Sequence, residues 1–275
     1  MVNTFLAQGA ACCLAEPDPE RKVRLTRQIA ALWVDDRLRA GAPPGWQPLA
    51  EPGRGERPRL VHPRDLPRRG LKDAAGRAAL IHAVAHIELN AINLAWDAVQ
   101  RFTDMQEPFQ GDWVGVAAEE AYHFGLMSER LEALGYRYGD FAAHDGLWAM
   151  ARRTAADPLE RMALVPRVME ARGLDVTPGM IERFRAAGDE DTAARLGIIL
   201  RDEVGHVAIG SRWFRHLCGE RGLDPWQTYV RLLEQHLGGQ VRCPLNRGDR
   251  LRAGFDEAEL DALEAMCARA RRDDG

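Results

Sequence analysis

The chain has 275 residues, and its hydrophobic content of 46% and charged content of 28% are ordinary for a soluble globular protein. The formal net charge of −4 gives no electrostatic attraction to nucleic acid or to an anionic membrane, so we expect neither as a partner. Five cysteines without framework spacing, no apparent signal peptide and no run of 18 apolar residues predict a cytoplasmic protein that does not span a membrane.

Helical periodicity dominates the sequence and period-two strands are missing, so we predict an all-α protein. The first predicted helix begins at Asp18-Pro19, an N-cap followed by a first-turn proline, and runs to about Arg39. Residues 42–69 are rich in Pro, Gly and Arg and show no periodicity. We expect an ordered but irregular strap, with a disordered linker as the alternative. Its apolar side chains should be buried: Trp46, Leu49, Leu60 and Val61.

Four long helices with apolar stripes are predicted after the strap, in two pairs, at 73–102, 112–134, 157–172 and 189–217. A long connection between the pairs, with a short helix, covers 136–156. Shorter helices are predicted at 177–187, after Asp224 and after Asp256, with a break at 238–254. We therefore expect three segments: an N-terminal helix and strap (1–72), a four-helix bundle (73–220) and a C-terminal helical extension (221–275).

Two copies of one spacing, Glu120-x-x-His123 and Glu203-x-x-His206, lie on the second and fourth long helices. Residues three apart project from the same face of a helix, so each pair can present a carboxylate and an imidazole together. A single pair of this kind is often a surface ion pair. Two pairs, each centred on an apolar stripe, are much harder to explain in that way.

Two further carboxylates complete the pattern. Glu88 precedes Glu120 by 32 residues and Glu170 precedes Glu203 by 33, each on its own apolar stripe. Buried carboxylates repel one another and cost several kcal/mol without a partner, whereas bound cations remove both problems. One Glu from each of two helices and Glu-x-x-His from each of two more is the ligand set of a di-iron or di-manganese site in a four-helix bundle. The predicted metal ligands are Glu88, Glu120, His123, Glu170, Glu203 and His206.

Neighbouring residues extend the predicted site. Asp202 and Glu119 directly precede the Glu of a Glu-x-x-His pair, and metal-bound imidazoles commonly donate to a carboxylate. We predict that each hydrogen-bonds to the ligand His of the opposite helix, with a solvent-facing charge as the alternative. Pro166 lies one turn before Glu170 and removes a backbone hydrogen bond there. Two glycines of the fourth long helix should leave space beside the site (Gly205 and Gly210).

Other candidate residues have simpler interpretations. His82, His86 and Asn90 form a row on the first long helix, and a polar face packed on another segment is favoured over a second metal or an interface. His144 could line a channel, but a cap at a helix start is favoured. The neighbours Cys12 and Cys13 are expected to be buried or partly buried thiols rather than a redox or metal site.

Several of these segments resemble the ferritin-like superfamily, and more closely an uncharacterised bacterial ferritin-like family. The likeness covers about residues 50 to 220, and the segments that carry it are 63–69, 82–90, 119–124, 138–148, 165–175 and 202–207. It implies a ferritin-like four-helix bundle with a long central crossover, extended by N- and C-terminal helices. It is specific for fold and metal ligands and unspecific for the reaction, because the superfamily supports many activities.

The predicted function is that of a hydroxylase- or oxygenase-like oxidoreductase. Two iron ions, with manganese as the alternative, would activate O₂ or peroxide to oxidise an unidentified small substrate. No flavin or nicotinamide motif is found, so electrons would come from a separate reductase. The alternatives are a ferroxidase or iron-handling protein without an organic substrate, and a bundle without catalysis. Exposed apolar residues on the flanking helices indicate a homo-oligomer only weakly.

Overall fold

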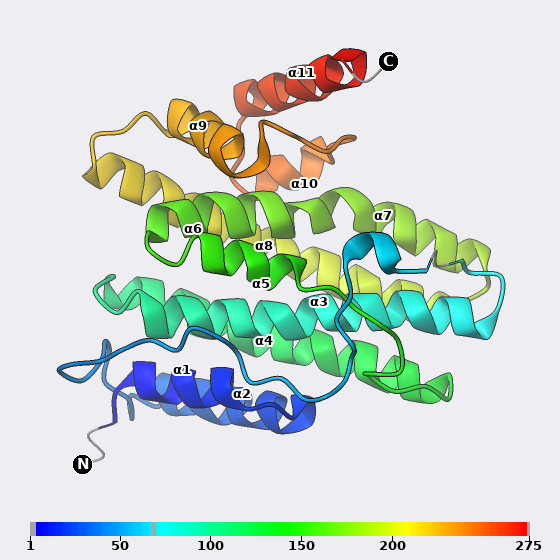
Figure 1. Cartoon of the computed structure of the whole chain (residues 1–275), viewed down its shortest axis with the longest axis horizontal. Coiled ribbons are helices and arrows are strands. Elements are labelled where there is room, and N and C mark those ends of the chain that lie inside the picture. Colours follow the sequence, from blue (N-terminus) through cyan, green and yellow to red (C-terminus); the bar gives the residue numbers. More distant parts are fainter. Residues whose placement is uncertain (1–3, 68–69, 274–275) are drawn as a thin grey trace. The chain divides into compact units, whose positions relative to one another are not determined.

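The computed structural model describes residues 4–67 and 70–273, and their fold is an all-α helical bundle (Figure 1). Only two isolated β-bridges accompany the helices in these ranges. The chain divides into two compact units, Met1–Arg152 and Arg153–Gly275. This division differs from the expected boundaries at 72/73 and 220/221. Arg68 and Arg69, at the end of the expected strap, lie outside the described residues.

The first unit is organised around two long antiparallel helices, α3 (Ala74–Arg101) and α4 (Glu107–Ala133), which lie side by side (Figure 1). α1 (Leu6–Ala15) packs on α3, and α2 (Pro19–Val34) packs on α4. α3 begins where predicted, because the carboxylate of Asp73 accepts a hydrogen bond of 2.7 Å from the Gly76 N–H. Most side chains of α3 are buried, so this helix forms the centre of the unit.

The ends of the other helices differ from the predictions by a few residues. α2 starts after the predicted cap, Asp18, but ends at Val34 rather than near Arg39, because Asp36 adopts a left-handed backbone conformation with φ of 54°. α4 starts at Glu107, five residues earlier than expected. α1 was not predicted as a helix, since its small and apolar residues show no clear stripe.

The strap after α2 is irregular, as predicted, apart from the short helix η1 (Pro63–Asp65). Hydrogen bonds attach it to the C-terminal end of α3. The Trp46 indole donates to the Gln100 carbonyl at 2.8 Å, and the Gln100 side chain exchanges two hydrogen bonds with the backbone of Leu49. The expectation that Leu49 and Leu60 are buried is wrong, because they are 36% and 38% exposed. The strap is therefore held largely by polar contacts with α3.

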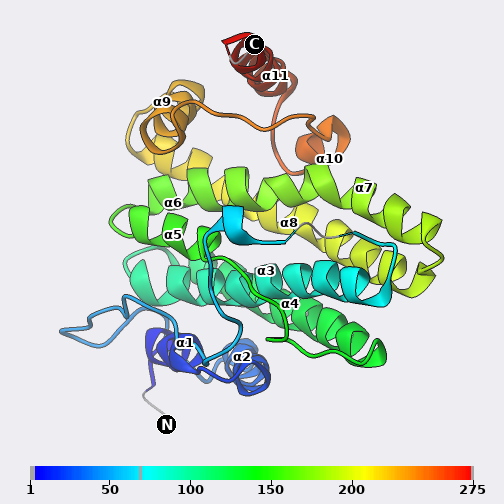
Figure 2. The ribbon, with the colours of Figure 1, turned by 45° about the vertical axis from the view of Figure 1, so that its right-hand side comes forward.

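The second unit contains a long helical run antiparallel to α8 (Glu190–Glu220) (Figure 2). The run consists of α6 (Pro158–Leu164), the π-helix η2 (Val165–Glu170) and α7 (Ala171–Ala186). The predicted break between 172 and 177 is absent from this continuous run, and Pro178 lies inside α7. Pro178 cannot donate to the carbonyl four residues earlier.

A side chain from a distant part of the unit compensates for that missing donor. The carbonyl of Leu174, four residues before Pro178, accepts a hydrogen bond of 3.1 Å from the side-chain amide of Asn246. Asn246 also caps the short helix α10 (Arg247–Arg252), which lies inside the predicted break at 238–254. Because its usual helical donor is replaced in this way, the Leu174 carbonyl is satisfied and α7 continues through the proline.

Gly210 of α8 contacts the proline at the start of the π-helix. A Cβ added at this position would lie 2.2 Å from Cγ of Pro166, so the expectation that Gly210 leaves open space is wrong. Nothing lies within 4 Å of a Cβ built on Gly205.

We expect Gly210→Ala to lower the free energy of unfolding by about 1–3 kcal/mol, because the ring of Pro166 must move to admit the methyl group. Gly197→Ala, in the same helix with nothing within 4 Å of its added Cβ, is the matched control and should be neutral or stabilising. Urea unfolding of both variants measures the difference. Equal stabilities would show that the Pro166 contact does not constrain α8.

The C-terminal part of the second unit includes α9 (Pro225–Leu237) and α11 (Glu257–Asp273), which start after the predicted caps Asp224 and Asp256. A disulfide joins Cys243 to Cys267, 24 residues apart. The cysteine spacing had predicted none. The pairing was missed because a disulfide depends on the close approach of two segments, which an irregular spacing does not show.

By length and mean hydropathy (1.3), α3 could cross a membrane. However, 83% of its most apolar 18-residue window is buried in the protein, as is usual for the central helix of a packed core. It is the one such helix among the described residues.

Candidate metal centre

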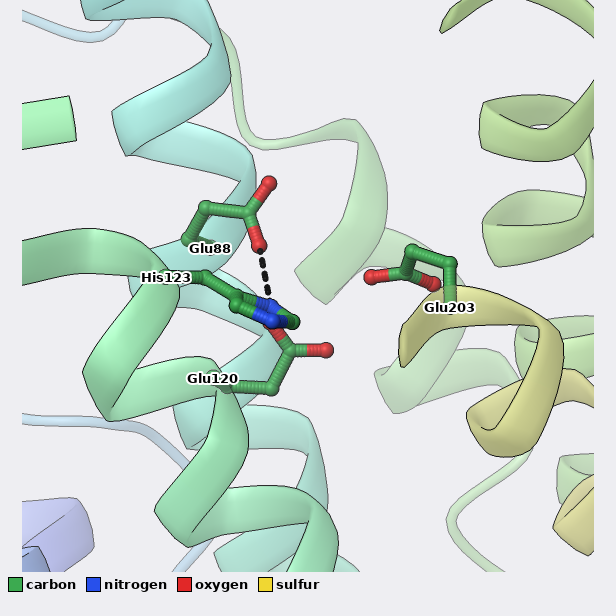
Figure 3. Close-up of side chains that lie close together, drawn as sticks. All are labelled: Glu88, Glu120, His123 and Glu203. Carbon is green, nitrogen blue, oxygen red and sulfur yellow. Dashed lines mark ion pairs between the residues drawn. The ribbon is translucent and has the colours of Figure 1, made fainter. Parts of the chain in front are cut away.

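The first unit brings together three of the six predicted metal ligands. Glu88 comes from the middle of α3, and Glu120 and His123 come from α4 (Figure 3). His123 Nδ1 lies 3.5 Å from Oε2 of Glu88 and 3.4 Å from Oε2 of Glu120. One ligand atom of each residue lies within 4.8 Å of the others. Glu120 and His123 are fully buried and Glu88 is 3% exposed, so the prediction that these three side chains face the interior is confirmed.

The charges of this cluster influence one another strongly. Burial, and then the neighbouring charge of Glu120, raise the pKa of Glu88 well above its usual value. Burial alone would lower the pKa of His123, but hydrogen bonds and charge interactions with Glu120 and Glu88 raise it to about 11. At neutral pH the metal-free cluster therefore retains a proton on His123, and the carboxyl of Glu88 binds a proton more readily than a free carboxyl. These protons offset the negative charge that two buried carboxylates would otherwise carry.

This donor set fits a hard metal cation. Two carboxylates and one imidazole are ligands that suit iron and manganese, and no thiol lies among them. A cation bound to Glu88, Glu120 and His123 would replace the retained protons as the compensating positive charge. It would also relieve the repulsion between two carboxylates in a site from which water is excluded.

The second unit places two more predicted ligands on one face of α8. His206 Nδ1 lies 3.6 Å from Oε1 of Glu203 (labelled in Figure 3), and the two residues are 1% and 9% exposed. Their spacing repeats that of Glu120 and His123 on α4. The inward orientation predicted for both side chains is therefore found.

Glu170 is the last residue of the π-helix η2 and is partly exposed. A π-turn inserts an extra residue into a helix and is frequently found at functional sites. The sequence predicted that Pro166 disturbs the helix before Glu170, and the structure shows this disturbance as a π-helix that begins beside Pro166. The inserted residue shifts the face on which Glu170 lies relative to α6.

The two carboxylates predicted to support the ligand histidines lie in different environments. Asp202 is partly exposed and accepts a hydrogen bond of 2.8 Å from Nε of Arg201. Glu119 is exposed. The predicted hydrogen bonds from the ligand histidines to these carboxylates stay a prediction.

The row on α3 packs against the connection that precedes α5 (Gly146–Arg153), as the simpler interpretation predicted. His86 Nδ1 lies 2.8 Å from the Tyr138 hydroxyl, and His82 Nε2 accepts a hydrogen bond from the Gly139 N–H at 2.9 Å. Burial lowers the pKa of His86 to about 3, so this imidazole is neutral at physiological pH. His144 Nδ1 accepts from the Gly146 N–H at 3.1 Å, which confirms its role at the helix start.

The two neighbouring cysteines differ in their surroundings. Cys12 is exposed, whereas Cys13 is buried and burial raises the pKa of its thiol to about 12. A thiol with so high a pKa is protonated at neutral pH and is a poor nucleophile and metal ligand. The prediction of a packed thiol is therefore confirmed for Cys13 and wrong for Cys12.

We expect metal binding to weaken as the pH falls. In the metal-free protein His123 holds a proton at neutral pH and the raised pKa of Glu88 favours its protonated form, and both residues must release protons before they bind a cation. The apparent affinity for Mn²⁺ should therefore rise by about tenfold per pH unit for each proton released, over roughly pH 6 to 8. Calorimetric titrations in buffers of different ionisation enthalpy will measure the released protons. An affinity that does not change with pH would contradict these protonation states.

The fold and these clusters define an all-α helical bundle in which each unit presents buried carboxylate and imidazole side chains. Residues 15–261 match the family described as "Protein of unknown function (DUF455)", and the chain belongs to this family. It is similar to an uncharacterized protein of Haemophilus influenzae, with 49% identity over 213 residues. That alignment covers 75% of this chain and 74% of the relative. No solved structure matches the chain.

Proposed function

We propose that the protein is a ferritin-like di-metal carboxylate protein in which six side chains bind two metal ions. Glu88, Glu120 and His123 would supply one half of the ligands, and Glu170, Glu203 and His206 the other. The observation that carries the proposal is the buried cluster of Glu88, Glu120 and His123, whose chemistry calls for a cation. The recurrence of a close Glu and His pair on α8 supports a second, similar half.

Iron is the metal proposed, with manganese as the alternative, because both are hard enough for carboxylates and also accept imidazole. Bound as a pair, the ions would supply the redox chemistry that reduces O₂ or a peroxide. In each half of the protein, carboxylates would bind the metal cations and one imidazole would complete the ligand set. The burial of Glu120 and His123 keeps bulk water from competing for these positions.

On this basis we propose an oxidoreductase that oxidises a small molecule. A separate protein would act as the reductase, since the sequence contains no flavin or nicotinamide motif. The sequence predicts no further metal ligands, so these six residues make up the whole of the proposed catalytic site.

The experiment is anaerobic titration of the metal-free protein with ferrous iron, followed by exposure to O₂. The proposal predicts saturation at two irons per chain and a change in optical absorption on exposure. Glu120→Gln should lose the iron binding and the absorption change, while Glu132→Gln, at an exposed position in the same helix, should keep them. Iron bound beyond two per chain, with an exchangeable ferric product, would indicate iron handling instead. No absorption change in the wild type would remove the oxidoreductase proposal.

A further inference from the structure

The first unit contains a pocket that none of the six candidate metal ligands lines. Its walls come from the start of α2, the strap, the middle of α3 and the connection before α5. The space between protein atoms measures about 460 Å³, its open mouth included. The polar residues that line it are Lys22, Arg54, Arg57, His86, Asn90, Asn93 and Tyr138.

The pocket lies on the opposite side of α3 from the metal cluster. At about 100° per residue, Asn90 is turned roughly 200° from Glu88 around the helix axis, and Asn93 is turned roughly 140°. Glu88 faces α4, whereas the two asparagines face the strap, which runs beside α1 and α3 in Figure 1. The pocket is therefore a separate site and does not depend on the proposed function.

Two buried amides on α3 have acceptor atoms that lack a hydrogen bond. Asn90 and Asn93 are 2% and 3% exposed, and within the described ranges Oδ1 of each has no donor. The orientation of Asn90 is fixed, because its Nδ2 donates to the His86 carbonyl at 2.7 Å and so leaves Oδ1 as the open acceptor. Buried acceptors of this kind cost free energy unless water or a ligand donates to them.

A buried lysine forms another wall of the pocket. The Lys22 ammonium donates to the carbonyls of Cys13 and Leu14, both at 2.8 Å, and has no third acceptor among residues 4–67 and 70–273. Burial lowers the pKa of Lys22 to about 7, because the charged form is poorly solvated there. An anion in the pocket would supply the missing acceptor and favour the charged ammonium.

Two arginines of the strap lie at the rim. Arg54 pairs with Asp145, so its charge is balanced. Arg57 is exposed and makes no ion pair within the part of the chain that the structure describes. Together with Lys22, Arg57 gives an anion two cationic partners.

The strap holds this arrangement in place. The Gly53 N–H donates to the Leu14 carbonyl at 2.8 Å, and a Cβ at this position would meet the Ala15 carbonyl oxygen at 1.9 Å. Only glycine permits so close an approach. The rim that carries Arg54 and Arg57 is therefore fixed against the end of α1, and the pocket is formed before a ligand binds.

We propose that this pocket binds a small organic anion that also carries hydroxyl or amino groups. Its carboxylate or phosphate would pair with Lys22 and Arg57, and its hydroxyl or amino hydrogens would be donated to Oδ1 of Asn90 and Asn93. Neutral His86 and the Tyr138 hydroxyl add a polar wall without adding charge.

The test uses calorimetric titration of the metal-free full-length protein with two matched pairs of probes. Malate and succinate differ by one hydroxyl group, and glycerol 3-phosphate and glycerol differ by the anionic group. The proposal predicts one-to-one binding of malate or glycerol 3-phosphate. Whichever of the two binds more strongly shows whether the pocket prefers a carboxylate or a phosphate. The matched probe that lacks the hydroxyl or the charge should bind at least about tenfold more weakly.

Two variants locate the binding. Arg57→Gln should weaken it by about tenfold, while Arg59→Gln, an exposed neighbour outside the pocket, should leave it unchanged. Asn93→Leu should remove binding without loss of stability, since it removes an unsatisfied buried amide. The proposal is overturned if neither anion binds at millimolar concentration. It is equally overturned if both Arg57→Gln and Asn93→Leu bind the anion as strongly as the wild type does.

Discussion

Glu120→Gln will abolish binding of the metal pair while leaving the metal-free protein almost as stable as the wild type. In the metal-free wild type, two carboxylates and an imidazole share retained protons, because Glu88 and His123 both have raised pKa values. In the Glu120→Gln variant, Glu88 and His123 can still form a pair of opposite charges. We therefore expect the free energy of unfolding to change by less than about 1 kcal/mol without metal.

With metal the two proteins should differ greatly. A ligand that binds only the native state at 100 times its Kd stabilises it by about 2.7 kcal/mol, and the wild type should show at least this gain with Mn²⁺. Glu120→Gln should show none, since the site loses one carboxylate charge and a ligand oxygen. Urea unfolding with and without Mn²⁺ measures both quantities, and Glu132→Gln is the control. Full metal-dependent stabilisation of Glu120→Gln would remove Glu120 from the site.

Arg167→Ala will destabilise the second unit more than any substitution on its surface. Arg167 is fully buried in the π-helix and donates to Oε1 of Glu259 at 2.8 Å. Its guanidinium also lies 4.3 to 5.2 Å from the centres of three aromatic rings (Phe255, Tyr229 and Phe214). Its removal leaves the carboxylate of Glu259 with fewer partners in a buried site, so we expect a loss of about 3–5 kcal/mol.

Equilibrium unfolding in urea provides the measurement for this variant. Arg183→Ala, an exposed arginine of α7, is the matched control and should change stability by less than about 0.5 kcal/mol. The double variant Arg167→Met/Glu259→Met should recover part of the loss, because it leaves no buried charge unpaired. A loss in Arg167→Ala no larger than that of the control would contradict the role given to this residue.

Helix starts were the part of the fold that the sequence predicted best. Asp18, Asp73, Asp189 and Asp224 each accept a hydrogen bond from a backbone N–H of the first turn, as their sequence context indicated. Such a cap depends on residues three positions apart, so it can be recognised locally. The continuity of α7 through Pro178 could not be recognised locally, because the compensating hydrogen-bond donor is Asn246, 72 residues after Leu174.

The same distinction, between features set by neighbouring residues and features set by distant segments, applies to the site. The buried faces of Glu120 and His123 follow from helical spacing, and the distance between Glu88 and His123 follows once α3 and α4 pair. The π-helix at Glu170 and the anion pocket beside the strap depend on contacts between distant segments. Because the strap has no periodicity, nothing in the sequence indicates where Arg57 or Gly53 lies.

The most direct test of the proposed di-metal centre is a crystal structure of the manganese-loaded protein with anomalous scattering. We expect two anomalous peaks about 3.5–4 Å apart, the separation usual for paired metals. One should be bound by Glu88, Glu120 and His123, and the other by Glu170, Glu203 and His206, with shared carboxylates allowed. Peaks bound by other residues, or no peak beside Glu120 and His123, would contradict the proposed centre.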